Sequence, residues 1–152
     1  MNPRQKSIII RSVVVVVGTA AFIVAMLNVR DYVNRAEAMR TMEHLGEKVR
    51  QYRAKYNSTP PKSYLTGQKT DLQDVRLGDF EYRAPWIEPG ASSDTILAYA
   101  GKNYQFAVGK GYIVMRLDGS VEWMGRAKFK ELLSKQQTQA EIKLLQHQRS
   151  EF

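Results

Sequence analysis

The sequence contains no cysteine and only two histidines, and these absences exclude several kinds of functional chemistry. A chain without cysteine forms no disulfide, binds no metal through thiolates and has no thiol nucleophile. His44 lies among charged residues of an expected helix, which is typical of a solvated histidine. His147 has neither a second histidine nor a suitably spaced carboxylate for a metal site. Because no glycine-rich, phosphate-binding loop precedes an expected helix either, we expect no enzymatic activity and no cofactor.

Acidic residues are also few, since 15 Asp and Glu stand against 23 Lys and Arg and leave a net charge of +8. Asp71, Asp74 and Asp79 lie in one expected loop, but their spacing differs from that of an EF-hand. We interpret this loop as solvated and expect no metal there, with a loop calcium ion as the alternative. The 152 residues leave room for one modest domain.

What the sequence does contain is a long uncharged run, Ser12–Val29. As a helix this run spans about 27 Å, close to the roughly 30 Å of a bilayer core. We predict an uncleaved signal anchor, with residues 1–11 as a basic tail and residues 30–152 as the outer domain. A cleaved signal peptide is the main alternative, but the run is long for one and ends without a clear small-x-small site. A buried core helix is the other alternative, and so small a domain cannot surround an all-apolar cylinder.

The orientation in the membrane is not decided by the flanking charges. Three basic residues flank each side of the run, so the positive-inside rule gives a tie. We expect the N-terminus in the cytoplasm, because a short tail is easily retained there while a whole domain is translocated. This predicts a single-pass protein of a bacterial inner membrane with a periplasmic or otherwise extracytoplasmic domain.

The residues after the run predict that the same helix continues to Tyr56. Asn57-Ser58-Thr59 and Pro60-Pro61 then end it, since proline disfavours helix at the preceding residue. An apolar stripe follows the helix at spacings of four and three residues, and it consists of Ala38, Met42, Leu45, Val49, Tyr52 and Tyr56. We interpret the stripe as domain core, with a coiled coil between protomers as the alternative. Gly46 either permits a close backbone approach or is simply tolerated.

The C-terminal half predicts a small sheet followed by a helix. The loop 57–94 includes one short strand near 80–82, and further strands are expected at 95–100, 103–108, 112–117 and 120–124. Gly109-Lys110-Gly111 and Asp118-Gly119 are expected turns, and a helix is expected over 126–148. The predicted fold is α+β, with a long transmembrane-plus-stem helix packed on the single apolar face of an antiparallel meander, and a C-terminal helix.

This layout resembles type IV pilin-like proteins and pseudopilins. More specifically, Val108–Trp123 and the helix after it resemble the C-terminal segment of prepilin-type H-x9-D-G proteins, through Gly109, Gly111, Asp118-Gly119 and Val121-Glu122-Trp123. Two features depart from that family. Val108 occupies the position of its histidine, and the Gly-Phe-Thr-Leu-x-Glu pattern of the prepilin peptidase is absent. The resemblance therefore implies a permanently anchored relative more than a processed filament subunit.

We therefore expect a non-catalytic, pilin-like component of a cell-envelope assembly, such as a type II secretion-like or pilus-type system. The expected partners are membrane lipid and other envelope or pilin-like proteins, self-association included. Nucleic acid is disfavoured because acids are interspersed with the bases, and no small-molecule substrate is identified. The candidate interaction residues are the six stripe residues together with Phe129, Leu132 and Leu133.

The alternative function is a tethered extracytoplasmic module that binds glycan, peptide or lipid on an aromatic sheet face. Four aromatic residues discriminate between the two functions, namely Tyr99, Tyr104, Tyr112 and Trp123. If several of these side chains point away from the stem, the ligand module is favoured. If all of them face the stem, the assembly component is favoured.

Overall fold

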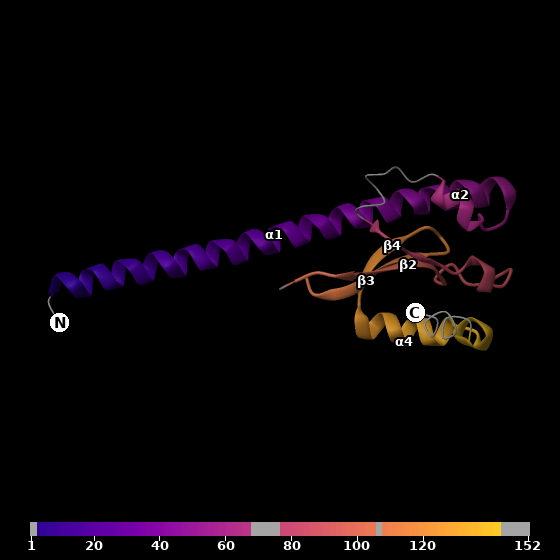
Figure 1. Cartoon of the computed structure of the whole chain (residues 1–152). Coiled ribbons are helices and arrows are strands. Elements are labelled where there is room, and N and C mark those ends of the chain that lie inside the picture. Colours follow the sequence, from indigo (N-terminus) through magenta and orange to yellow (C-terminus); the bar gives the residue numbers. More distant parts are fainter. Residues whose placement is uncertain (1–2, 68–76, 106–107, 144–152) are drawn as a thin grey trace.

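The apolar run and the stem form one continuous helix in the computed structural model, which describes residues 3–67, 77–105 and 108–143. Helix α1 (Pro3–Tyr56) extends far beyond the rest of the molecule in its N-terminal half (Figure 1). It ends where the sequence predicts. Asn57 adopts a positive φ of 49°, a left-handed conformation that asparagine tolerates at a helix end.

The sheet is an antiparallel meander, as predicted, and it has four strands. Its strands are β1 (Glu81–Tyr82), β2 (Ile96–Asn103), β3 (Lys110–Arg116) and β4 (Val121–Gly125), in the spatial order β1-β2-β3-β4. Two short helical segments, α2 (Lys62–Thr66) and η1 (Ala84–Trp86), lie in the connection between α1 and β2. The predicted α+β fold class is therefore confirmed.

The predicted strand 103–108 is wrong in its described residues, because 104, 105 and 108 belong to no strand, and 106–107 lie outside the described residues. Strand β2 continues through Gly101 to Asn103, which pairs with Lys110 of β3. Gly101 does not interrupt β2, since it pairs with Tyr112 of β3 within a continuous ladder. Lys110 and Gly111 consequently belong to β3, and of the expected Gly109-Lys110-Gly111 turn only Gly109 has the positive φ of a turn glycine.

Both faces of the sheet are covered, whereas the sequence pattern predicts a single apolar face. The stem of α1 packs on one face through Met42, Leu45 and Val49, which meet Ile113 and Met115. Helix α4 (Arg126–Gln136) covers the other face, where Phe129 packs with Ile96, Val114 and Met124. Strands β2 and β3 have apolar residues at consecutive positions, as strands buried on both sides do. The result is three layers (Figure 1).

The C-terminal helix is shorter than predicted. Helix α4 ends at Gln136, and Gln137 is extended, with φ −81° and ψ 137°. Helical backbone resumes at 139–143, and the rest of the predicted helix lies outside the described residues. The interruption has a physical cause. Gln136 uses its side chain and its backbone carbonyl to contact the sheet edge, where its Oε1 accepts a hydrogen bond from the Ile96 N–H at 2.8 Å.

Candidate functional site: the junction of the apolar helix and the sheet

The N-terminal half of α1 exposes an apolar surface that nothing in the described structure covers. Its most apolar stretch is entirely unburied, and α1 is long and apolar enough to cross a membrane. Side chains such as Val15, Val16 and Phe22 are about two-thirds exposed. An exposed apolar surface of this size is consistent with a membrane anchor.

The sheet first meets α1 at a small polar and aromatic cluster, which we call the collar. It consists of Asp31, Arg35, Tyr104, Gln105 and Trp123. The Asp31 side chain is buried, and its Oδ2 accepts a hydrogen bond from the Gln105 N–H at 2.7 Å. The Arg35 guanidinium lies 5.6 Å from the centroid of the Trp123 ring, and the Tyr104 ring lies 5.8 Å from the same ring. Burial, and secondarily Asp31, raises the pKa of the Tyr104 phenol, which therefore stays neutral.

The collar lies next to the end of the apolar run. Asp31 is two residues beyond Val29, a distance of about 3 Å along a helix. The β2–β3 end of the sheet points along α1 toward its apolar half (Figure 1). A membrane that covers Ser12–Val29 would consequently have the collar at its surface.

A second junction holds the far end of the sheet on the stem. A Cβ on Gly46 would lie 2.4 Å from the carbonyl oxygen of Gly119, and a Cβ on Gly119 would lie 2.7 Å from that of Gly46. Arg53 donates a hydrogen bond to the Leu117 carbonyl beside this contact. The close-approach interpretation of Gly46 is therefore confirmed. Its partner is the Asp118-Gly119 turn, where Gly119 has a φ of 82°.

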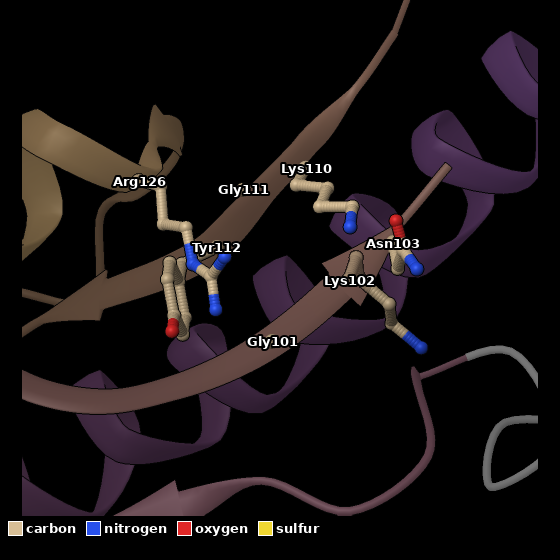
Figure 2. Close-up of a pocket in the computed structure, with 7 residues that line it drawn as sticks. All are labelled: Gly101, Lys102, Asn103, Lys110, Gly111, Tyr112 and Arg126. Atoms are coloured by element: carbon tan, nitrogen blue, oxygen red, sulfur yellow. The ribbon is translucent and has the colours of Figure 1, made fainter. Parts of the chain in front are cut away.

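A pocket opens on the α4 face of the sheet, near its β2–β3 end. Its volume is about 250 Å³. The lining residues are Gly101, Lys102, Asn103, Lys110, Gly111, Tyr112 and Arg126 (Figure 2). Burial lowers the pKa of Lys102, whose Nζ lies 3.7 Å from where a Cβ of Gly78 would be.

Most of the predicted interaction residues are core residues. Ala38, Met42, Leu45 and Val49 are at most 1% exposed, so the interpretation of these four as core is confirmed, and they are unavailable for a coiled coil. Phe129 is also buried, and Leu132 and Leu133 pack against it as half-buried residues. Tyr52 contacts the rings of Tyr56 and Tyr64, whereas Tyr56 remains 54% exposed.

The four discriminating aromatic residues divide between the two faces of the sheet. Tyr99 and Tyr112 point away from the stem, but α4 covers them, with the Tyr112 ring stacked 3.8 Å from that of Phe129. Trp123 faces the stem, with Tyr104 beside it. Gly111 sits under the indole, where any Cβ would lie 2.5 Å from it. Helix α4 therefore packs on part of this aromatic face, and Tyr112 also lines the pocket at its β2–β3 end.

Sequence reasoning missed one buried ion pair. Arg83 and Glu141 are 2% and 1% exposed, and the guanidinium contacts both carboxylate oxygens, at 2.7 and 2.9 Å. Arg83 also donates to the carbonyls of Ile96 and Gln136. The pair therefore ties the segment after α4 to the β1–β2 edge. The two residues are 58 positions apart, so no local pattern signals the contact.

Within the described part of the chain, no group of three His, Asp or Glu side chains is positioned to hold a metal ion. Asp71 and Asp74 of the predicted acidic loop lie outside the described residues, and Asp79 is exposed. No protein-family model, no curated protein and no solved structure matches the chain.

Proposed function

We propose that the protein is a single-pass, pilin-like membrane protein that acts non-catalytically in a cell-envelope assembly. In this proposal α1 anchors the chain, the N-terminus lies in the cytoplasm, and the β-meander domain is periplasmic or otherwise extracytoplasmic. One observation carries the proposal. A single helix has a fully exposed apolar half and, without a break, a stem half that is built into the core of the domain.

Lateral association in this proposal uses the membrane half of α1. Four residues of the stem stripe, Ala38, Met42, Leu45 and Val49, are buried in the domain core, and only Tyr56 at its C-terminal end is exposed, so the stripe offers little contact to a neighbour. The exposed apolar side chains lie instead along the N-terminal half of α1, from Ile8 to Val33. The wide and even exposure of this surface suits contact with lipid and with other membrane helices.

Site-directed cross-linking in native membranes tests the proposal. The chain has no cysteine, so an introduced cysteine is its only thiol. We expect a thiol-reactive photo-cross-linker on a Val15→Cys chain to capture membrane-embedded components of a secretion or pilus-type system, or a second copy of the chain. Ser92→Cys, on an exposed loop of the domain, is the matched control.

The identity of the captured proteins decides the result. Envelope-assembly components enriched at Val15→Cys over Ser92→Cys support the proposal. Adducts to lipid alone at Val15→Cys, or the same unrelated soluble proteins at both positions, contradict it.

A further inference from the structure

The pocket on the α4 face is basic. Lys110 and Arg126 supply its charged groups, whereas the Lys102 ammonium lies near Gly78, 3.7 Å from where a Cβ of that residue would be. Within the described part of the chain no acidic side chain lines the pocket. Figure 2 shows Arg126 beside the Tyr112 ring and Lys110 beside Asn103, with Lys102 directed away from both. Lys110 and Arg126 are exposed, so their charged groups reach solvent at the mouth of the pocket.

The pocket lies at the end of the domain that faces the predicted membrane. Asn103 and Lys110 form the pair nearest the β2–β3 loop, and Gln105 in that loop contacts Asp31. At about 3.3 Å per strand residue, the pocket begins within roughly 10 Å of the level of Asp31. A headgroup layer is about 5–8 Å thick. Long Lys and Arg side chains span the remaining distance.

The chemistry of the lining suits a phosphate group. An arginine guanidinium binds two phosphate oxygens at once, and a lysine ammonium adds a compact charge. Helix α4 begins at Arg126, with no acidic residue in its first turn and no side-chain cap from Gly125. The positive end of the helix dipole therefore adds to the positive electrostatic potential of the Lys110 and Arg126 side chains. The pocket lies between these two charged side chains and is also lined by Gly101, Asn103 and Tyr112.

We propose that this pocket binds the phosphate of an anionic phospholipid headgroup and thereby holds the domain against the membrane surface. The inference rests on the proposed function, because it requires α1 to lie in the bilayer. A soluble phosphate ester offers the same chemistry. Lipid is favoured because α1 fixes the pocket at headgroup height, where the local concentration of lipid phosphate is high.

The test uses the full chain, labelled with ¹⁵N, in nanodiscs of phosphatidylcholine with increasing phosphatidylglycerol. Amide signals of Gly101 and Gly111 report on the pocket. We expect both to shift saturably with phosphatidylglycerol content. In a Lys110→Gln/Arg126→Gln chain the midpoint rises by about fivefold for each charge removed. The matched control, Lys128→Gln/Lys130→Gln, removes two exposed charges of α4 outside the pocket and shifts the midpoint less than about twofold.

Two results would overturn the inference. Equal changes of the phosphatidylglycerol midpoint in the two double variants would mean that the basic side chains attract the anionic membrane surface diffusely, without a specific phosphate site in the pocket. Comparable shifts with glycerol 3-phosphate over pure phosphatidylcholine nanodiscs mean that the pocket takes a soluble phosphate. Retention of the chain in pure phosphatidylcholine nanodiscs is scored separately, so failure of anchoring is distinguishable from failure of the pocket.

Discussion

At the scale of single residues, the contact between Gly46 and Gly119 fixes how the sheet sits on the stem. Each glycine lies where a Cβ would strike the backbone of the other. The sequence shows both glycines and identifies Asp118-Gly119 as a turn. It cannot show that this turn packs on Gly46, because the two glycines are 73 positions apart and no local pattern connects them.

We expect Gly46→Ala to destabilise the domain by about 1–3 kcal/mol. The added Cβ would lie 2.4 Å from a backbone oxygen that has no rotamer to escape into. This cost opposes the gain of up to about 1 kcal/mol in helix propensity. Urea unfolding of the full chain in detergent, followed by near-ultraviolet circular dichroism, measures the difference.

Gly18→Ala is the control for this prediction, because Gly18 lies in the same helix with nothing within 4 Å of its Cβ position. We expect no loss of domain stability from it. A Gly46→Ala chain as stable as the Gly18→Ala chain would show that the sheet does not sit on the stem at this contact.

At the scale of elements, the local patterns predict most of the helices and strands but not where each of them ends. Apolar residues at successive spacings of 4, 3, 4, 3 and 4 define the stem helix. Apolar residues that recur with a period of two locate most of the strands. The prediction fails at the end of β2, which is expected at residue 100 but lies at Asn103, and at Gln137, where α4 stops without proline or glycine. In both places a tertiary contact outweighs the local preference.

The interruption after Gln136 lets Glu141 reach Arg83. We expect Glu141→Ala to cost about 3–5 kcal/mol, because it leaves a buried guanidinium without its carboxylate. Arg83→Met/Glu141→Leu removes both charges and restores part of that loss, because the carbonyls of Ile96 and Gln136 also lose their donor. Thermal unfolding of the three chains in the same detergent provides the comparison.

Glu131→Gln is the matched control, since it breaks the exposed pair between Glu131 and Lys135 on the same helix. We expect the melting temperature to be almost unchanged there. Equal losses from Glu141→Ala and Glu131→Gln would mean that the buried pair does not hold the segment after α4.

At the scale of the whole molecule, the account depends on where the membrane surface lies. The uncharged run predicts its position in the sequence, and the structure places the collar next to the end of that run, where Asp31 is buried and accepts a hydrogen bond from the Gln105 N–H. The sequence predicted the anchor and the stem on hydropathy and periodicity alone. It could not predict that the pocket and the start of α4 lie at the same end of the domain as the collar, because that arrangement arises only when the strands are in register.

Labelling of intact cells with a membrane-impermeant maleimide tests most directly whether α1 stays in the membrane with the domain outside. Two single-cysteine chains are compared, Ser134→Cys on the exposed face of α4 and Ser7→Cys near the N-terminus. The account predicts that Ser134→Cys is labelled in intact cells and Ser7→Cys only after lysis, with the full-length chain in the membrane fraction after alkaline carbonate washing. Labelling of Ser7→Cys before lysis, or a domain that starts after Ala25 and leaves with the wash, would contradict it.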